Sequence, residues 1–313
     1  MAQAANATRV ICVRARELSP EAIDILRSED TPEPMRRGHM TEKTPLRTVA
    51  GVDVGSTTTK ALVLDEQGRI LSSDIRPTGA DSRAASAQAL GSALAKARLA
   101  EDPAFVVSTG YGRDISARSD KQITEITCHA RGVHALLPSV RTIIDIGGQD
   151  SKVIKITGTG KVIDFAMNDK CAAGTGRFLE VMAHSLGVSL DRMGELSLNA
   201  SKNIRVSSMC TVFAESEVVS LVARGEKVED ILNGVHLAIA DRVASLALRV
   251  GLEPEVAITG GVAKNIGVVR ALEERLAVAL RIPDEPQLTG ALGAATIALE
   301  RIRCVGDRFL GHS

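Results

Sequence analysis

The stretch that decides the fold is TVAGVDVGSTTTKALVLDEQGRILSSDI, residues 48–75, which returns in similar form as TIIDIGGQDSKVIKITGTGKVIDFAM, residues 142–167. Each copy predicts a strand, a glycine turn, a second strand, a tight glycine-bearing turn and a third strand. The copies keep four pairs of residues in register: Asp53 with Asp145, Gly55 with Gly147, Lys60 with Lys152 and Gly68 with Gly160. One Asp-x-Gly turn arises easily by chance, but a second hairpin in the same register does not. We therefore interpret the repeat as an internal duplication that gives two similar lobes.

Strands and helices alternate after each copy, which indicates an α/β class. Beyond the first copy we expect a helix over 82–99, a strand over 104–108 and a helix near 125–135. Beyond the second copy we expect helices over 176–186, 212–224 and 228–250, a strand over 256–259, a helix after 265 and a last helix from 290. This order predicts a first lobe over 47–140 and a second lobe over 141–313. It leaves open whether the last helix returns to the first lobe.

Residues 1–46 differ from the rest of the chain. The segment TPEPMRRGHMTEKTP, residues 31–45, is rich in proline and charge and has no hydrophobic period. We expect residues 1–46 to be an N-terminal extension that is flexible. An over-extended start, with Met40 as the true first residue, stays open as the alternative.

Composition excludes several classes of protein. The 313 residues carry 38 Lys+Arg against 38 Asp+Glu, and nucleic-acid binding would leave a basic excess. Aromatic residues are only 2 %, so a stacking platform for single strands is not expected. No apolar run reaches the roughly 18 residues that span a bilayer, and the first thirty residues lack a signal-peptide core. Five scattered cysteines do not form a secreted disulfide framework, so we expect a cytoplasmic protein without nucleic-acid or membrane partners.

The two first turns of the duplicated hairpins are candidate phosphate-binding turns, because glycine lets backbone N–H groups approach phosphate oxygens. The candidate contacts are Gly55, Ser56, Thr57, Thr58 and Lys60 in the first copy, and Gly147 and Gly148 in the second. Asp53 and Asp145, at the two strand ends, would hold a hydrated Mg²⁺ or orient an attacking water. The sequence does not say which does which. No Gly-x4-Gly-Lys-Ser/Thr motif is present, which excludes a P-loop protein.

A third glycine turn, ITGGVAKN (258–265), follows a strand and opens a helix. Gly260 and Gly261 there are candidate contacts to an adenosine. Together the three segments, within residues 48–300, resemble the actin, sugar-kinase and heat-shock-70 superfamily of ATPases, in which the two phosphate loops and the adenosine loop occur in this order. The resemblance implies two duplicated lobes around a nucleotide cleft that binds ATP or ADP with Mg²⁺.

Two of the cysteines are candidate metal ligands. Cys171 and Cys210 each come immediately before a predicted helix, where free N–H groups and the helix dipole favour a thiolate. Two thiolates are half of the four that a [4Fe–4S] cluster needs, and a symmetric dimer supplies the others. Buried structural cysteines are the alternative that these residues alone leave open. Glu125 and His129, four residues apart, could face one site, but we expect a surface pair on a helix.

The strings NDKCAAGTGRFLEVMA (168–183) and SSMCTVFAESEVVSLVARG (207–225) closely resemble the BadF/BadG/BcrA/BcrD ATPase family. This family includes activators of 2-hydroxyacyl-CoA dehydratases and ATPase subunits of benzoyl-CoA reductase. The resemblance implies that Cys171 and Cys210 ligate one [4Fe–4S] cluster shared by two subunits. It also implies that ATP drives a low-potential electron into a partner acyl-CoA dehydratase or reductase, with a ferredoxin or flavodoxin as donor.

Several points stay open at this level. The shared cluster fits either a homodimer or a pair with a closely related ATPase subunit. Gln149, aligned with Thr57, is our catalytic-site candidate for sensing the γ-phosphate. A small-molecule kinase acting on a sugar or acyl group, or a filament-forming ATPase, would use the same fold. Neither alternative gives the two cysteines a role.

Overall fold

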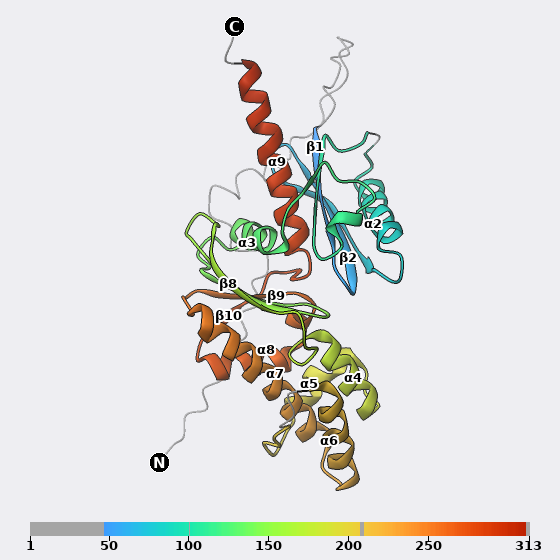
Figure 1. The fold of residues 1–313 in the computed structure, drawn as a ribbon, viewed down its shortest axis with the longest axis vertical. Helices are drawn as coiled ribbons and strands as arrows, with labels where there is room; N and C mark the ends of the chain where they lie inside the picture. Colours follow the sequence, from blue (N-terminus) through green and yellow to red (C-terminus); the bar gives the residue numbers. More distant parts are fainter. Residues whose placement is uncertain (1–46, 100, 207–209, 311–313) are drawn as a thin grey trace, which may run out of the picture. The chain divides into compact units, whose positions relative to one another are not determined.

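The computed structural model describes residues 47–99, 101–206 and 210–310, so the predicted extension, residues 1–46, lies outside the described residues. The described chain contains two five-stranded sheets that share one strand order (Figure 1). The first sheet, in the order β3-β2-β1-β4-β5, is built from β1 (Thr48–Val54), β2 (Thr58–Asp65), β3 (Ile70–Pro77), β4 (Phe105–Thr109) and β5 (Lys121–Gln122). The second, in the order β8-β7-β6-β9-β10, is built from β6 (Thr142–Ile146), β7 (Ser151–Ile156), β8 (Val162–Asn168), β9 (Val256–Thr259) and β10 (Leu280–Arg281).

The two sheets match in register as well as in order, which confirms the duplication. Asp53 pairs with Lys60 across β1 and β2, and Asp145 pairs with Lys152 across β6 and β7. Even the irregularity is repeated: a bulge falls between Val63 and Leu64 in the first sheet, and between Lys155 and Ile156 in the second. Since bulges re-aim a strand and are retained as designed features, the duplication extends to details that the sequence pattern does not display.

Strand β1 lies in the middle of the first sheet and is buried along its whole length. Its side chains alternate between two layers, as a strand requires. Val52 and Val54 pack with Ala89 and other residues of α2 (Ser82–Lys96), whereas Val49 packs with residues of α9 (Thr289–Leu310). The last helix of the chain therefore covers one face of the first sheet, and α2 covers the other (Figure 1).

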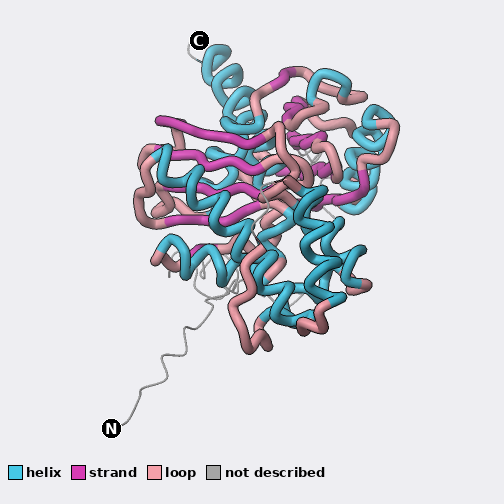
Figure 2. Tube along the Cα trace, turned by 60° about the horizontal axis from the view of Figure 1, so that its bottom comes forward, coloured by secondary structure: helices cyan, strands magenta, loops and turns pink. Residues whose placement is uncertain are grey.

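The second sheet is also covered by helices on both faces. Figure 2 shows the molecule's helices in cyan packed against its strands in magenta. One face packs against α3 (Glu125–Leu136). Helices that follow the second hairpin form the larger core on the opposite side: α4 (Gly176–Leu186), α5 (Met193–Ser197), α6 (Thr211–Ala223), α7 (Val228–Val250) and α8 (Ile266–Leu276). Three short 3₁₀ turns complete the described elements: Arg113–Ile115, Leu190–Arg192 and Gly261–Lys264.

Helices α3 and α9 cross each other between the two sheets. A Cβ atom at Gly132 of α3 would collide with the backbone of α9 at Thr289, and one at Gly293 of α9 would collide with the backbone of α3 at Cys128. Glycine at both positions therefore lets the two backbones touch. Because α3 packs on the second sheet and α9 on the first, this crossing joins the two lobes.

The predicted elements agree closely with the structure. The helices over 176–186 and 228–250 and the strand over 256–259 have the predicted bounds, and the other predicted ends coincide with the structure or shift by one to three residues. Among the described helices, α7 alone is long and apolar enough to cross a membrane by length and composition. Its apolar window is 61 % buried inside the second lobe, which is the environment of a core helix.

Candidate functional site

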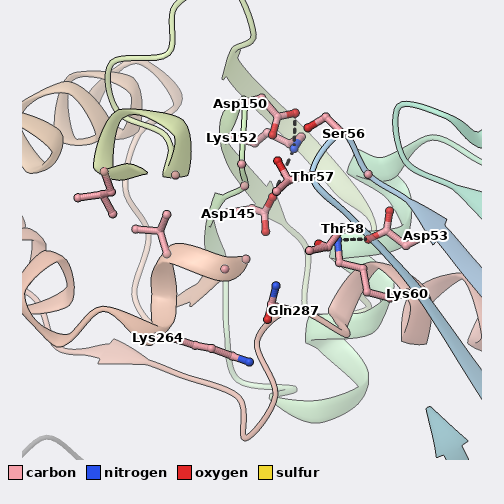
Figure 3. A pocket seen from close by; sticks show the side chains of 18 of the residues that line it. Asp53, Ser56, Thr57, Thr58, Lys60, Asp145, Asp150, Lys152, Lys264 and Gln287 are labelled. Atoms are coloured by element: carbon pink, nitrogen blue, oxygen red, sulfur yellow. Dashed lines mark hydrogen bonds and ion pairs between the residues drawn. The ribbon is translucent and has the colours of Figure 1, made fainter. Parts of the chain in front are cut away.

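A cavity of about 560 Å³ lies where the two hairpin turns and the turn after β9 converge (Figure 3). All the nucleotide-site residues selected from the sequence line it except Gln149: Asp53, Gly55, Ser56, Thr57, Thr58, Lys60, Asp145, Gly147, Gly148, Gly260 and Gly261. Gln149 is exposed at the tip of the second turn and is not part of the cavity wall. The fold thus gathers side chains that are as much as two hundred residues apart in the chain.

The first turn is held closed by backbone hydrogen bonds. Gly55 N donates to Thr58 O at 3.1 Å, and Thr78 Oγ1 donates to Gly55 O at 2.7 Å. A Cβ at Gly55 would lie 2.8 Å from Thr58 O, so no larger residue fits this turn. Ser56 and Thr57 are left exposed at its tip. The turn therefore presents hydroxyl and N–H donors to the cavity, which suits a phosphate.

The second turn has the same closure and an additional attachment. Gly147 N donates to Asp150 O at 2.9 Å. The first N–H groups of α4 then donate back to this turn, Gly176 N to Gly147 O at 2.9 Å and Arg177 N to Gly148 O at 2.8 Å. These bonds satisfy donors that every helix leaves unpaired at its N-terminus. The second turn and the start of α4 therefore form one hydrogen-bonded unit.

Asp53 lies at the end of β1, and Asp145 lies at the end of β6. Lys60 Nζ approaches Asp53 Oδ2 at 3.2 Å, and Lys152 Nζ approaches Asp145 Oδ2 at 3.3 Å. Figure 3 shows both carboxylates near the cavity, each beside the lysine of its own hairpin. Both aspartates are almost completely buried. The structure thus brings the two predicted catalytic carboxylates to one cavity from different lobes.

Asp145 has further partners. Thr259 Oγ1 donates to Asp145 Oδ1 at 2.7 Å, and His129 Nδ1 lies 3.5 Å from the same oxygen. Burial by itself would raise the pKa of Asp145, but His129, Lys152 and the Thr259 hydrogen bond outweigh it and hold that pKa below its ordinary value. Asp145 therefore stays ionised, as a group facing a metal or its bound waters must.

Lys152 is a buried cation surrounded by carboxylates. Its Nζ lies 2.7 Å from Asp150 Oδ2 and 3.8 Å from Glu125 Oε2, in addition to its contact with Asp145. Burial would lower the pKa of Lys152, but the three carboxylates raise it above its ordinary value. The lysine therefore remains charged in the cavity wall. The alignment of Lys152 with Lys60 in the duplicated hairpins could have identified Lys152 as a candidate site residue from the sequence.

Glu125 and His129, predicted as a surface pair, form part of the cavity wall instead, so that prediction was wrong. His129 is buried, with Nδ1 3.1 Å from Thr289 Oγ1. Burial raises the pKa of Glu125, which Lys152 only partly opposes. The spacing allowed a shared site, but it did not distinguish this arrangement from an exposed pair, because the same spacing occurs on any amphipathic helix.

The third turn follows β9. Gly260 has φ +85° and its N–H donates to Pro286 O at 3.0 Å, while Asn265 caps α8 with bonds to Gly267 N and Val268 N. Lys264 and Gln287 reach the cavity from this side (Figure 3). Lys264 supplies a positive charge and Gln287 supplies an amide on the side of the cavity where the sequence predicts the adenosine.

The first lobe has a counterpart of this turn that the sequence reasoning did not identify. Gly110 follows β4 with φ +88°, and Thr109 stands opposite Asp53 as Thr259 stands opposite Asp145. Tyr111 takes the place of Gly261 and lines the cavity with 85 % of its surface exposed. The duplication therefore includes the third turn, with an aromatic side chain in one copy and none in the other.

The two candidate metal ligands lie outside this cavity. Cys210 is exposed at the N-cap of α6, and Cys171 is half-buried in the turn before α4, where Asn168 Nδ2 donates to Cys171 O at 2.8 Å. Within the described residues no three His, Cys, Asp or Glu side chains gather into a metal site. Cys210 therefore lies at a helix N-terminus as predicted, whereas Cys171 lies four residues before Thr175, the N-cap of α4, so the prediction that it immediately precedes a helix was wrong. Neither thiol belongs to a fully buried residue, which fits half of a four-thiolate set.

The other cysteines give no such site. Burial raises the pKa of Cys128 to about 12, so this thiol stays protonated within the core. Cys304 is exposed near the end of α9, and Cys12 lies outside the described residues. The structure therefore separates Cys171 and Cys210 from the rest by location.

Comparison with known proteins identifies relatives along most of the chain. A family model described as the BadF/BadG/BcrA/BcrD ATPase family matches residues 50–298. The 2-hydroxyisocaproyl-CoA dehydratase activator of Clostridioides difficile is 47 % identical over 254 residues, or 81 % of this chain and 95 % of that protein. One of the subunits of the benzoyl-CoA reductase of Thauera aromatica is 34 % identical over 258 residues, or 79 % and 91 %.

Solved structures agree with these matches. The structure of the Clostridium difficile activator with bound ADPNP superposes with a TM-score of 0.79 and 45 % identity, covering 83 % of this chain and 97 % of that one. A ROK family glucokinase from Streptomyces griseus has a TM-score of 0.51 at 17 % identity, covering 81 % and 99 %, and shares the fold alone. The predicted fold, two duplicated lobes of the actin and sugar-kinase type around a nucleotide cleft, is confirmed.

Proposed function

Because the chain belongs to the BadF/BadG/BcrA/BcrD ATPase family, we propose that it is an ATP-hydrolysing electron carrier that activates an acyl-CoA enzyme. The partner is a 2-hydroxyacyl-CoA dehydratase or, as the second choice, a benzoyl-CoA reductase. The relatives support this order, since the dehydratase activator is 47 % identical and the benzoyl-CoA reductase subunit is 34 % identical. The reaction belongs to the cytoplasm, where thiols stay reduced.

The nucleotide site uses the residues of the cavity. The backbones of the first two turns would hold the phosphates, and the turn at Gly260 and Gly261 would hold the adenosine. Asp53 and Asp145 would face the Mg²⁺ and the attacking water from opposite sides. Gln149 remains our candidate for sensing the γ-phosphate because its neighbours Gly148 and Asp150 both line the cavity.

Cys171 and Cys210 would ligate one [4Fe–4S] cluster together with the same two residues of a second subunit. When bound, this cluster supplies a one-electron carrier of low potential. The surface of α6 supports such a dimer: Val212, Phe213, Val219 and Val222 are 46–68 % exposed on a helix that begins at Cys210. Exposed apolar side chains gathered in one place mark protein interfaces. A homodimer would cover them while it completes the set of four thiolates.

The single observation that carries the proposal is the attachment of α4 to the second turn. Gly147 O and Gly148 O accept hydrogen bonds from the first turn of α4, which directly follows the Cys171 turn. A nucleotide that moves the second turn therefore moves the helix beside Cys171. Neither a kinase nor a filament protein would need the turn and the thiol to be connected in this way.

The first experiment measures iron and sulfide in anaerobically purified protein. We expect about four of each per dimer, and their loss in Cys171→Ala and Cys210→Ala. Cys304→Ala removes another exposed thiol and should keep the full content. A colourless wild-type protein, or a fully loaded Cys171→Ala protein, would contradict the proposed ligands and favour the kinase alternative.

The second experiment tests the connection between nucleotide and thiols. We expect an iron chelator to remove iron faster from reduced protein with a non-hydrolysable ATP analogue than with ADP. By linkage, the nucleotide can shift the thiol environment only as far as it distinguishes two lobe arrangements. Gln149→Ala should bind the analogue but lose the difference. Equal rates in wild-type protein would refute the coupling.

A further inference from the structure

A second groove, of about 1030 Å³, lies in the second lobe and shares no lining residue with the nucleotide cavity. Its walls come from the end of β8, the turn after Cys171, the segment 203–206 and the face of α7. Ala173 and Gly174 line it three residues or fewer after Cys171, and Arg205 lines it five residues before Cys210. The groove therefore borders the turn that follows Cys171 and the segment 203–206, which precedes Cys210 in the chain.

The groove is strongly basic although the chain as a whole has no net charge. Arg205, Arg242, Arg249 and Arg275 line it, and Asp241 is the one acidic residue among the lining residues. Asp241 is already paired with Arg275 at 2.6 Å. Within the described part of the chain, the other three arginines form no ion pair. Three guanidinium groups without an ion-pair partner make this groove a favourable place for an anion to bind.

Arg242 connects the groove to the Cys171 turn. A Cβ at Gly174 would lie 3.3 Å from Arg242 Cγ, so the arginine stem packs directly on the turn. Gly174 has φ +89°, a conformation in which glycine avoids the strain of a side chain. Arg242 is half-buried, whereas Arg205 and Arg249 are exposed. The groove thus has one guanidinium anchored at the turn and two at its open edge.

We propose that this groove docks an acidic surface of the electron-donor protein, with donor carboxylates seated on Arg205, Arg242 and Arg249. The inference rests on the proposed function, which requires a protein donor to approach Cys171 and Cys210. Guanidinium groups bind carboxylates bidentately, and complementary charge speeds encounter and fixes orientation. The donor would lose one electron as its flavin hydroquinone is oxidised to the semiquinone, and a cluster held by Cys171 and Cys210 would accept that electron.

Binding is measured first, with oxidised flavodoxin of strongly acidic surface as the probe and the intact dimer as the receptor. We expect Arg242→Glu to raise the flavodoxin Kd about tenfold at low salt, with a smaller effect at high salt. Arg249→Glu changes an exposed residue and should act in the same direction without affecting folding. Arg83→Glu, on exposed α2 of the first lobe, makes the same charge change and should leave Kd unaltered. If the two groove variants bind flavodoxin with the same Kd as the Arg83→Glu control, the inference is overturned.

Reduction is measured next, with two donors of opposite charge. Arg242→Glu should slow reduction by flavodoxin about tenfold but leave reduction by the small cation radical of methyl viologen unchanged, because that donor needs no basic groove. Equal slowing with both donors would mean that the arginine acts on the cluster itself and would overturn docking. Iron content is determined in the same samples. Absence of iron from wild-type protein would refute the proposed function, whereas loaded variants with normal flavodoxin kinetics would refute only the groove.

Discussion

Asp53 and Asp145 occupy equivalent positions of two duplicated hairpins, yet their surroundings differ. Asp53 has one charged partner, Lys60, and Thr109, which stands opposite it, donates no hydrogen bond to it within the described residues. Asp145 is held by Lys152, by the Thr259 hydroxyl and by His129. These partners come from β7, β9 and α3, so the second carboxylate is fixed from three directions.

The comparison teaches that duplication preserved the backbone and left the side chains free to diverge. The second lobe, which carries the cysteines, contains the rigid carboxylate and the lysine with three acidic neighbours. The first lobe contains a carboxylate with a single salt bridge, which can adjust to a metal and its waters. Matched substitutions in the two lobes test whether this difference has the expected consequences.

The largest expected effect comes from the two lysines. Lys152→Met would leave three carboxylates in the cavity wall without their cation, and we expect a loss of about 3–5 kcal/mol in the free energy of unfolding. Lys60→Met leaves one carboxylate unpaired and should cost about 1.5–3 kcal/mol. Urea unfolding of both variants and the wild type measures the difference. Equal losses would show that the two lobes tolerate the change alike.

The two aspartates give the next effect. Asp53→Asn and Asp145→Asn each remove a charge without changing size, so ATP hydrolysis should fall at least ~100-fold in both, the scale of losing a positioning or acid–base group. Nucleotide binding should survive better than turnover. The variants should separate in stability, because Asp145→Asn disturbs the Lys152, Thr259 and His129 contacts whereas Asp53→Asn disturbs one. Wild-type turnover in both variants would mean that the cavity is not the ATPase site.

The repeat itself made most of the fold predictable. Two Asp-x-Gly hairpins in register predicted two similar lobes, whereas the common strand order and the shared bulge became visible only in the structure. The crossing of α3 and α9 could not be predicted from the sequence. That crossing depends on Gly132 and Gly293 meeting backbone to backbone, although they are far apart in the chain and each looks unremarkable within a helix.

The candidate site was predictable wherever a turn motif carries the chemistry, as at Gly55, Gly147 and Gly260. It was not predictable where a helix brings side chains into the cavity. Glu125 and His129 have a spacing that every exposed helix shares, and only the packing of α3 under the second sheet makes them part of the wall. Gln149, selected by its alignment with Thr57, lies outside the wall in this structure, so its role stays a prediction.

The glycines of the third turns give a smaller effect. Gly260 and Gly110 both have positive φ. A Cβ added at Gly260 would lie 2.7 Å from Ile146 C, and a Cβ added at Gly110 would lie 2.6 Å from Val54 O. We expect Gly260→Ala and Gly110→Ala each to cost about 2–3 kcal/mol in unfolding free energy. Gly251, with φ +81° and open space around it, is the matched control, and its alanine variant should cost only about 1 kcal/mol.

The same pair distinguishes the lobes in nucleotide binding. Gly260 lines the cavity, whereas Gly110 does not line it but lies behind Asp53, with an added Cβ 2.5 Å from Asp53 Oδ1. Gly260→Ala should therefore weaken ADP binding severalfold, and Gly110→Ala, which acts only through Asp53, should weaken it less. Calorimetric titration with ADP measures this. Equal weakening in both variants would mean that the first-lobe turn also contributes to the nucleotide site.

The smallest effect is a difference in acid sensitivity between the lobes. In the second lobe, burial lowers the pKa of His236 to about 4, against an ordinary value of 6.5, and the ring is held by Ser197 and Asn265. In the first lobe, burial would raise the pKa of Asp74, but bonds from Lys96, Ser92 and Arg76 outweigh it and lower that pKa to about 2.

The sign of each contribution sets a pH window. Unfolded His236 takes up a proton near pH 6.5, whereas folded His236 takes it up only near pH 4, so its contribution to stability is complete above pH 6.5 and is lost progressively as the pH falls from 6.5 to 4. The Asp74 contribution is present above pH 3.8 and is lost only as the pH falls through 2. Between pH 7 and pH 5 the second lobe should therefore lose about 2 kcal/mol, and the first lobe should lose nothing from Asp74.

Hydrogen exchange at pH 7 and pH 5, corrected for the intrinsic exchange rates, tests this lobe by lobe. Protection should fall in α8 and α5, which pack around His236, and should persist in β2, β3 and α2 around Asp74. The glutamine of the His236→Gln variant cannot be protonated. Whatever stability this variant loses at pH 7, it should therefore show the same protection at pH 5 as at pH 7. If wild-type protection falls equally in both lobes, or if His236→Gln keeps the same pH dependence, the buried histidine is not the acid-sensitive group of the second lobe.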